Sequence, residues 1–484
     1  MGSEQLSPKP ATFRPRWTWV FLAAIVLFAF NAYSLIQFSH RSDPPWPHGD
    51  GPDYESLAYS LSMGDGFQFA WEDPRWQAPY RDSALAAEYS QFQRRDLPGP
   101  TTSRPPALPW LISQVYRWIP RGPDAFACVR WLSLVALTLA GALAVWLASS
   151  WTAELLSPKV RSPVYFAALA ALVALGLAGV DRTIKTYMHD FLTEPWAALG
   201  VTILAWCLMR WAHGYGSLYW MIVSGAVFGV MILFRSLFIF WLPVVALGIF
   251  LLSNQAPAAR TVRWFARVRW FERVRCFELG IFFVMVCLVA GPWWVRNGSI
   301  TGRWMPMGAQ GAAALRGGYS DEALADWGNW HSDAEIAMQA KLDRVLGSEG
   351  WTAVEREVAL ADMASVETWD WIGKHWSDLP RLGAMRLVSH WGPWRIDHIV
   401  WKFLAFLGWV WIFRRCPRRG IVLASIFLAD ALTTALLYET GGRFLIPLHG
   451  LLYALAGVGV AGCLASAGVN PVPTRDEIRD SIGI

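Results

Sequence analysis

Acidic and basic side chains recur at the ends of the hydrophobic runs in this sequence, where a membrane protein can hold charges in contact with water. The acids are Asp50, Asp53, Asp190 and Glu194, and the bases are Arg104, Arg235, Arg296 and Arg443. Guanidinium groups bind a phosphate through paired hydrogen bonds, and a carboxylate can accept the proton of an attacking hydroxyl group. Such a set would suit chemistry on a phosphate-bearing lipid.

Most of these residues also have a purely structural interpretation. Asp50 precedes a predicted helix and could simply cap it, because the free N–H groups of a first turn favour a carboxylate. Asp190 could cap a later helix, and Glu194 suits the first turn of that helix. Arginines at the ends of spans commonly extend toward the membrane interface. Those with this simpler explanation are Arg104, Arg296 and Arg443.

The residues that follow Asp50 predict a short amphipathic helix. Apolar positions repeat at i, i+3, i+4 and i+7, and they are Tyr54, Leu57, Ala58 and Leu61. Pro52 is favourable in a first turn, and Gly64 with Gly66 would end the helix. Asp50 is therefore expected at or beside the N-terminal cap.

Long apolar runs dominate the chain of 484 residues, which is 54% hydrophobic and only 16% charged. A membrane span needs about 20 predominantly apolar residues. The predicted spans cover residues 17–39, 125–150, 163–180, 195–212, 217–234, 237–253, 279–295, 398–413, 421–438 and 444–465. The sequence therefore predicts an all-α polytopic membrane protein, a bundle of about 10–12 transmembrane helices with amphipathic surface helices in its first long loop.

Positive charge predicts the orientation of the spans, because cytoplasmic loops are enriched in Lys and Arg. The basic residues before the first span are Lys9, Arg14 and Arg16. Counting crossings from a cytoplasmic N-terminus places the arginine-rich loops 254–278 and 414–420 inside. The apolar stretch 107–119 is shorter than a span, and a crossing there would move both loops outside. It is expected to lie flat on the membrane surface.

This count divides the chain into five parts. They are a cytoplasmic N-terminal tail 1–16, a catalytic transmembrane module 17–295 with a first outer loop 40–124, an outer Trp-rich loop 296–397, C-terminal transmembrane helices 398–465 and a cytoplasmic tail 466–484. Tryptophan prefers the bilayer interface, so the Trp-rich loop is expected to lie along the membrane as short helices. The basic, aromatic stretch 260–275 is expected to contact anionic lipid of the bilayer.

Several function classes receive no support from the sequence. It contains no P-loop or Rossmann glycine pattern, so no nucleotide site is predicted. The net charge of +5 comes with arginines in predicted inner loops and does not indicate a nucleic acid partner. The six cysteines form no CxxC pair, and His189 has no other histidine at ligand spacing, so no metal site is predicted. A divalent cation as a cofactor is left open.

The order of these motifs resembles the GT-C class of integral-membrane glycosyltransferases, in particular the branch with the lipid A aminoarabinose transferase and the protein O-mannosyltransferases. Those enzymes carry an acid at the start of the first outer loop, followed by Tyr and Ala at four-residue steps, as Asp50, Tyr54 and Ala58 do here. Further similar elements are Gly64-Asp65-Gly66-Phe67, Arg104-Pro105-Pro106, Thr193-Glu194-Pro195, Phe234-Arg235, Pro292-Trp293-Trp294-Val295-Arg296-Asn297 and Arg443-Phe444-Leu445-Ile446-Pro447. The family often has two adjacent acids where this chain has Asp50-Gly51, so the choice between Asp50 and Asp53 as base stays open.

The resemblance implies transfer of a hexosyl or pentosyl group from a polyprenyl-phosphate donor to a hydroxyl acceptor, with inversion at the anomeric carbon. The acceptor would be a glycolipid, a cell-envelope polysaccharide or a protein. The enzyme would lie in the cytoplasmic (inner) membrane with its site facing the periplasm or the cell exterior. The implied roles are Asp50 as base, Arg104 as the leading phosphate ligand, Glu194 or Asp190 as the acid that orients the acceptor, and Arg235, Arg443 and Arg296 as further phosphate contacts.

Two other classes of protein are compatible with charges at the ends of spans. A transporter or flippase for lipid-linked sugars would carry acids and broken helices near the bilayer midplane and symmetric halves. Here the charges gather at one side of the predicted bundle, and the sequence shows no repeat. A non-catalytic polyprenyl-phosphate binding protein would tolerate the loss of Asp50 but not of Arg104.

Overall fold

The structure is a computed structural model that describes residues 17–47, 49–83, 96–156, 163–213, 217–253, 277–346, 350–392 and 396–467. The basic stretch 260–275 and the N-terminal tail 1–16 lie outside the described residues, as does nearly all of the C-terminal tail. Within the described ranges the chain is built from helices and contains no named strand, only an isolated β-bridge between Asn329 and Glu439.

Eight helical segments of the described chain are long and apolar enough to cross a membrane. They are α1 (Trp17–Gln37), α6 (Pro123–Leu155), α7 (Pro163–Val180), α9 (Glu194–Ala212), α12 (Phe277–Thr301), α18 (Ile396–Arg415), α19 (Pro417–Leu436) and the continuous pair η6 (Arg443–Leu448) and α20 (His449–Ser466). Shorter apolar helices are α10 (Ser217–Phe234) and η1 (Ser236–Trp241) with α11 (Leu242–Ser253). These helices coincide with the predicted spans in order, which confirms the all-α polytopic fold.

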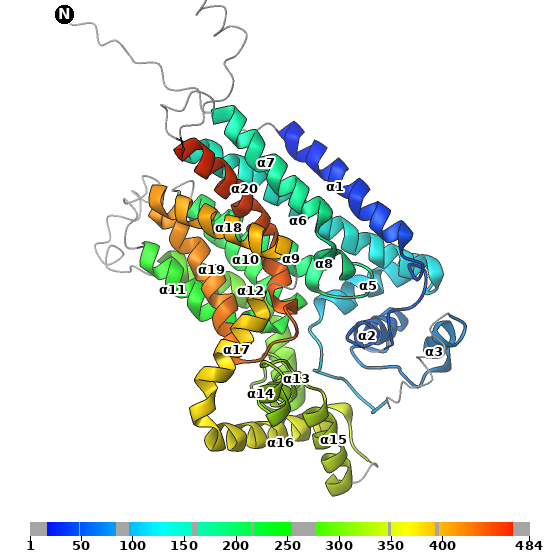
Figure 1. The fold of residues 1–484 in the computed structure, drawn as a ribbon. Coiled ribbons are helices and arrows are strands. Elements are labelled where there is room, and N and C mark those ends of the chain that lie inside the picture. Colours follow the sequence, from blue (N-terminus) through cyan, green and yellow to red (C-terminus); the bar gives the residue numbers. More distant parts are fainter. Residues whose placement is uncertain are drawn as a thin grey trace, which may run out of the picture.

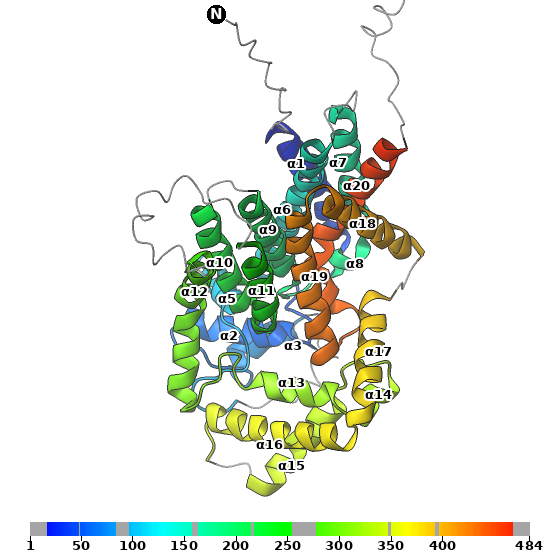
Figure 2. The same ribbon diagram turned by 90° about the vertical axis from the view of Figure 1, so that its left-hand side faces the viewer.

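Small residues let the bundle helices approach closely around α20, which is the most deeply buried of the long helices. A Cβ atom on Gly459 would lie 2.1 Å from the carbonyl oxygen of Leu404, so α18 and α20 are in backbone contact there. Gly225 and Gly229 of α10 lie equally close to α12, so this GxxxG pair serves helix packing. The helices run side by side in both ribbon views (Figures 1 and 2).

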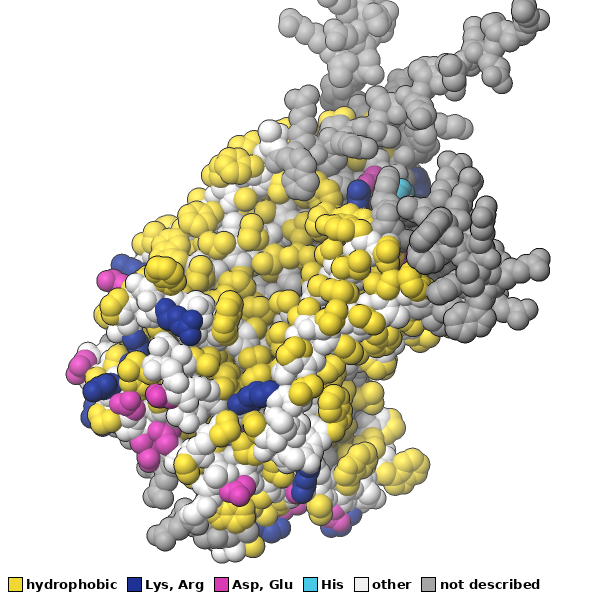
Figure 3. All heavy atoms as spheres, turned by 180° about the vertical axis from the view of Figure 1, so that it is seen from behind, with side chains coloured by type: hydrophobic (Ala, Val, Ile, Leu, Met, Phe, Trp, Pro, Cys, Tyr) yellow, Lys and Arg dark blue, Asp and Glu magenta, His cyan; other side chains and the backbone are white. Residues whose placement is uncertain are grey.

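The outer surface of the bundle is apolar. Seen from behind, hydrophobic side chains cover the flank of the long helices, and most of the charged side chains gather toward one end of the molecule (Figure 3). Large exposed hydrophobic residues on α1 illustrate the pattern, since Trp19, Phe21 and Tyr33 are each more than half exposed. Exposed apolar side chains on this scale, on helices long enough to cross a bilayer, are typical of a surface that faces lipid.

The first long loop folds into three helices in the described residues, α2 (Gly51–Met63), α3 (Pro74–Arg81) and α5 (Ala107–Trp118). Helix α2 begins and ends where the sequence predicts, with Pro52 in its first turn and Gly64 at its C-cap with a φ of 90°. Buried Glu55 of α2 binds Arg121 at 2.6 Å, which joins the helix to the start of α6. Helix α5 has 12 residues and is too short to span, in agreement with the prediction.

Residues between α12 and α18 form a layer of helices across the end of the bundle that also carries α2 (Figures 1 and 2). The helices are α13 (Gln310–Gly318), α14 (Asp321–Ala325), α15 (Asp333–Leu346), α16 (Ala353–Lys374), η5 (Trp376–Asp378) and α17 (Leu379–Trp391). Trp304, Trp369 and Trp376 of this layer are exposed. Trp371 is buried, and its Nε1 atom donates a hydrogen bond to Asp321. The layer is thus folded on itself and attached to the bundle, mainly through α17 and α19.

Candidate functional site

Asp50 occupies the N-cap position of α2 but does not cap the helix. Its backbone has helical dihedrals (φ −83°, ψ −23°), and its side chain makes no hydrogen bond to the first turn. A capping side chain normally requires an extended backbone at this position. The carboxylate instead binds two arginines, with Oδ1 at 2.7 Å from Nη2 of Arg104 and Oδ2 at 2.8 Å from Nη1 of Arg443. The interpretation of Asp50 as a simple cap is wrong.

Arg104 joins the two acids at the start of α2. Its Nε and Nη2 atoms donate to Oδ2 of Asp53 at 3.0 and 2.6 Å, while Nη2 also reaches Asp50. The guanidinium carbon lies 5.5 Å from the centre of the Tyr54 ring. Arg104 leads into Pro105 and Pro106, and α5 begins immediately afterwards, so the position of its backbone is set by a helix start.

Arg443 connects this pair of acids to Glu194. Its Nε atom donates to Oε1 of Glu194, and Nη1 of Arg235 lies 3.2 Å from the same oxygen. Glu194 is fully buried as the first residue of α9, and its Oε2 atom has no hydrogen-bond partner among the described residues. A buried carboxylate oxygen that points to no donor is a place where a ligand hydroxyl or N–H group can bind.

The acids and bases of this group compensate one another. Three carboxylates meet three guanidinium groups, and the side chains are between 0% and 25% exposed. Burial of charges on this scale is stable only when they are paired and hydrogen-bonded. We call Asp50, Asp53, Arg104, Glu194, Arg235 and Arg443 the charged cluster.

The cluster controls the protonation of Asp50. Burial by itself would raise the pKa of this carboxyl, but Arg104 and Arg443 lower the pKa well below its usual range. Burial raises the pKa of the neighbouring Tyr54 to about 12, so the phenol stays protonated at neutral pH. Asp50 is therefore an ionised, weakly basic group for as long as both arginines face it. Its basicity increases when another anion takes over an arginine.

Asp190 lies beside the cluster without joining it. Its Oδ1 accepts hydrogen bonds from the backbone N–H groups of Trp46 at 3.3 Å and Phe191 at 2.8 Å. Burial raises the pKa of this carboxyl. A Cβ atom on Gly51 would lie 2.8 Å from the same oxygen. The glycine after Asp50, where the family often has a second acid, is thus the residue that leaves room for Asp190.

Arg296 is placed apart from the acids of the cluster. Its Nη1 donates to the carbonyl oxygen of Thr101 at 2.9 Å and to Oδ1 of Asn297 at 3.1 Å. The guanidinium carbon lies 4.5 Å from the ring centre of Trp293. The structure therefore brings together six of the eight sequence-predicted residues, and it places Asp190 and Arg296 at the edges.

Two further side chains at the cluster were not predicted from the sequence. Gln310 of α13, with its amide oriented to satisfy both partners, donates to the carbonyl oxygen of Ser103 at 2.6 Å and accepts from Nη1 of Arg104 at 2.5 Å. Tyr438 is half-buried with Arg235 and Asp50 in electrostatic range, and loss of solvent around the phenol raises its pKa. No local pattern marks either residue, because each approaches the cluster from a distant part of the chain.

The donor set does not fit a divalent cation. Among the described residues no three His, Cys, Asp or Glu side chains gather as a group that could hold a metal ion. Both oxygen atoms of Asp50 face guanidinium groups rather than an open position.

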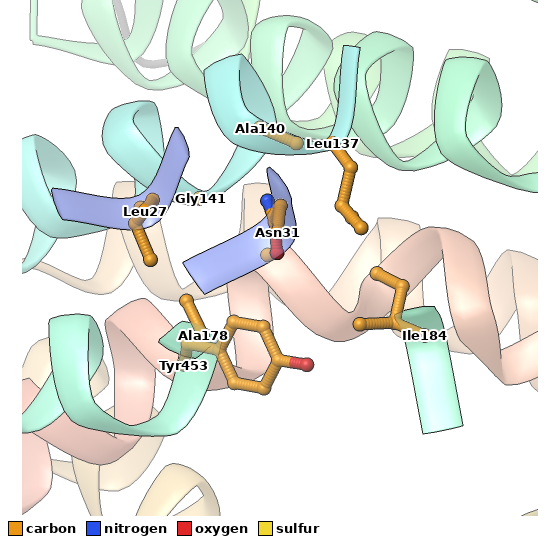
Figure 4. Close-up of a pocket in the computed structure, with 9 residues that line it drawn as sticks. Leu27, Asn31, Leu137, Ala140, Gly141, Ala178, Ile184 and Tyr453 are labelled. Carbon is orange, nitrogen blue, oxygen red and sulfur yellow. The ribbon is translucent and has the colours of Figure 1, made fainter. Parts of the chain in front are cut away.

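Two hollows in the described part of the chain are lined by none of the eight predicted residues. One is an apolar space of about 10 Å³ inside the bundle, which could hold at most a single water molecule. It is lined by Leu27, Asn31, Leu137, Ala140, Gly141, Ala178, Ile184, Gly450 and Tyr453 (Figure 4). The other, about 310 Å³, lies between α5 and α6 and is lined mostly by apolar side chains such as Trp110 and Leu132. Neither space replaces the charged cluster as the candidate site.

Comparison with known proteins gives matches only among solved structures: no protein-family model matches the sequence, and no curated protein does. The archaeal oligosaccharyltransferase AglB from Archaeoglobus fulgidus, in complex with an inhibitory peptide and a dolichol-phosphate, aligns with 96% of this chain at 12% identity and a TM-score of 0.52. The apo form of the A. fulgidus enzyme aligns with a TM-score of 0.50 at 11% identity, again over 96% of this chain.

This chain spans about half the length of the archaeal enzyme, since the alignments cover 53% and 54% of that protein. ArnT from Cupriavidus metallidurans bound to undecaprenyl phosphate aligns with 94% of this chain and 79% of its own, at 14% identity and a TM-score of 0.38. That score is too low to indicate a shared fold by itself. The match to the archaeal enzyme confirms, for the fold, the resemblance that the motifs indicated.

Proposed function

The chain has the fold of the GT-C membrane glycosyltransferases, and from this premise we propose that it transfers a sugar from a polyprenyl-phosphate donor to a hydroxyl acceptor. The acceptor would lie outside the cytoplasm, and the transfer would invert the anomeric carbon. A dolichol-phosphate bound to the archaeal enzyme supports a lipid-phosphate ligand for this fold. The sugar would be a hexose or a pentose, and the acceptor a glycolipid, an envelope polysaccharide or a protein.

One observation carries the proposal: Asp50 is held between the two arginines that would bind the donor phosphate. A phosphate that enters the cluster competes with Asp50 for Arg104 and Arg443. Phosphate and carboxylate oxygens accept the same charge-assisted hydrogen bonds from the guanidinium groups. Once the phosphate takes those donors, the pKa of Asp50 rises. Donor binding would thereby convert an inert carboxylate into a usable base, so the donor would bind before the acceptor reacts.

The reaction would be a single displacement. The acceptor oxygen attacks the anomeric carbon as the bond from that carbon to the phosphate oxygen breaks. The hydroxyl proton passes to Asp50, and the bonding electrons leave with the polyprenyl phosphate. Arg104 and Arg443 stabilise the negative charge that develops on the leaving phosphate, which is the electrostatic contribution expected of such groups.

The geometry also suggests a different role for each of the two acids at the start of α2, Asp50 and Asp53. Asp53 accepts two hydrogen bonds from Arg104, and its side chain is only 7% exposed. Asp50 is 23% exposed and is shared between two arginines. We assign Asp50 as the base and Asp53 as the group that orients Arg104. Glu194, with its free Oε2 atom, is assigned to orient the acceptor.

A transporter for lipid-linked sugars receives less support. Such a protein would carry its charged groups along a path near the middle of the membrane. Here the cluster lies at helix starts and at one end of the bundle, with Glu194 opening α9 and Arg443 opening η6.

The test uses the purified protein with radiolabelled polyprenyl-phosphate sugars, and measures both donor consumption and product formation. Asp50→Asn keeps the shape of the side chain and removes its basicity, so we expect a loss of kcat of about 10²–10⁴-fold. Asp53→Asn should mainly raise the donor KM, because Arg104 loses its orienting partner while Asp50 remains.

The matched control is Asp82→Asn at the exposed C-cap of α3, which should transfer sugar at the wild-type rate. Full transfer by the Asp50→Asn enzyme would show that the base has been assigned wrongly. Absence of both donor consumption and product with the wild-type protein, over hexosyl and pentosyl donors, would reject the function itself.

A further inference from the structure

The turn that precedes Arg443 determines where this arginine lies. Residues 437–442 connect α19 to η6, and Arg443 is the first residue of η6. Gly441 and Gly442 have φ values of 62° and 79°, a left-handed backbone that glycine adopts without strain. A reversal this tight leaves little freedom, so any group that fixes the turn also fixes the base of the Arg443 side chain.

The side chain of Glu439 stabilises the turn by hydrogen bonds to its backbone. Its Oε1 atom accepts hydrogen bonds from the backbone N–H groups of Thr440 at 2.9 Å and Gly442 at 2.5 Å. Its own backbone carbonyl accepts from the N–H group of Trp330 at 2.7 Å. Oδ1 of Asn329 accepts from the N–H group of Gly441 at 3.3 Å. The layer between α12 and α18 therefore holds this turn through its backbone.

His390 of α17 provides the remaining contact to Glu439. Its Nδ1 atom lies 2.8 Å from Oε2 of Glu439, and its Nε2 atom lies 2.6 Å from Oδ2 of Asp430 in α19. The histidine side chain is fully buried, and both acids are at most 3% exposed. One imidazole thus bridges the last part of α19 to the turn that follows it.

Two carboxylate partners favour a doubly protonated ring, because only the imidazolium form donates from both nitrogen atoms. Burial would lower the pKa of His390, but Asp430 and Glu439 raise it to about 9. The charged groups around this site are Asp430 on α19, Glu439 in the turn, Arg386 on α17 itself and Arg235 before η1. Deprotonation would leave one buried carboxylate without its donor, which is costly.

We propose that His390 is a positioning residue for Arg443, and that the layer between α12 and α18 completes the charged cluster through it. His390 holds Glu439, Glu439 holds the turn, and the turn places the guanidinium group that binds Asp50 and Glu194. The role of His390 in sugar transfer rests on the function proposed above. The role of His390 in holding the turn does not depend on that function.

The test compares wild-type protein with His390→Gln in two measurements. Hydrogen exchange followed by mass spectrometry should show amides of residues 438–448 exchanging about tenfold faster or more in the variant, while those of α2 are unchanged. The kcat/KM for the polyprenyl-phosphate sugar should fall about 10²-fold, as expected when a phosphate ligand is displaced by about 1 Å. His375→Gln is the matched control, because this histidine lies at the end of α16, away from the turn.

A pH profile gives a readout that a merely structural residue would not change. Transfer by the wild-type enzyme should be retained below pH 9 and lost as pH rises through about 9, where His390 loses its proton. The His390→Gln enzyme should lack this alkaline limb, because glutamine does not titrate.

A second variant keeps the proposal testable if His390→Gln does not fold. Asn329→Ala removes the acceptor for the Gly441 N–H group, together with the side-chain hydrogen bonds to Ser389 and Asp326. It should increase exchange in the same turn with a drop in kcat/KM of about tenfold. The proposal would be overturned if the amides of residues 438–448 exchanged at the wild-type rate in both variants. It would also be overturned if kcat/KM fell while amide exchange stayed unchanged. A wild-type protein without any transfer would reject the proposed function, while the exchange measurement would still decide on the turn.

Discussion

At the scale of single residues, the environment of Asp50 depends on the next residue, Gly51, having no side chain. Gly51 faces Asp190 on one side and Pro45 on the other, and a Cβ atom would lie 2.8 Å from each. Contacts that short force the neighbours to move. The carboxylate of Asp190 is itself fixed by two backbone N–H groups, so it has little room to yield.

We therefore expect Gly51→Ala to destabilise the protein by about 1–3 kcal/mol and to lower sugar transfer by displacing the start of α2. The measurements are the thermal unfolding midpoint in detergent and the transfer rate. Gly176→Ala is the control, because a Cβ atom there meets nothing within 4 Å and alanine favours the interior of a helix. Equal midpoints and rates for Gly51→Ala and wild type would contradict this account of the glycine.

At the scale of elements, the loop before α2 is held by an arginine from the bundle. Buried Arg130 of α6 donates to the carbonyl oxygens of Asp43 at 2.7 Å and Pro44 at 3.3 Å, both in the loop from α1 to α2. Its Nε atom donates to the carbonyl oxygen of His189 at 2.8 Å, beside Asp190. One side chain thus ties together the segments that carry Asp50 and Asp190.

Arg130→Met should remove these donors while it retains much of the side-chain volume. Buried carbonyl groups left without partners cost about 1–3 kcal/mol each, so we expect a loss of stability of about 3 kcal/mol and weaker transfer. Denaturant or thermal unfolding in detergent measures the loss of stability. The radiolabelled donor assay measures sugar transfer. The exposed Arg117→Met on α5 is the control. A wild-type unfolding midpoint for Arg130→Met would show that the loop is held by other contacts.

At the scale of the whole molecule, α2 and the helical layer from α13 to α17 lie at one end of the bundle (Figures 1 and 2). The last turn of α18, with exposed Arg414, belongs to the opposite end if α18 and α19 both cross the membrane. The distribution of positive charge predicts that the end with the cluster faces away from the cytoplasm.

Single cysteines in a background without native cysteines can test this orientation. A membrane-impermeant maleimide applied to intact cells or right-side-out vesicles should label cysteine at exposed positions 82 and 370, and should label position 414 only after the membrane is permeabilised. The reverse pattern would place the charged cluster on the cytoplasmic side and would exclude an acceptor outside the cytoplasm.

The sequence alone determined the helices and their order. Hydrophobic length and local spacing encode a span or an amphipathic helix, so the bundle and the bounds of α2 could be predicted without any tertiary contact. The residue types that end the spans could also be found, because a charge beside an apolar run is conspicuous. The motif order extended this to the GT-C fold.

Only the tertiary structure decided which charges meet. Asp50 could equally have capped α2, and it became an ion-pair partner because Arg443, almost the whole chain away, is brought to it by η6. Gln310 and His390 carry no local signal, since their roles depend on how the helical layer packs on the bundle. Pairing between remote segments depends on the packing of everything between them, and a local pattern contains no information about that packing.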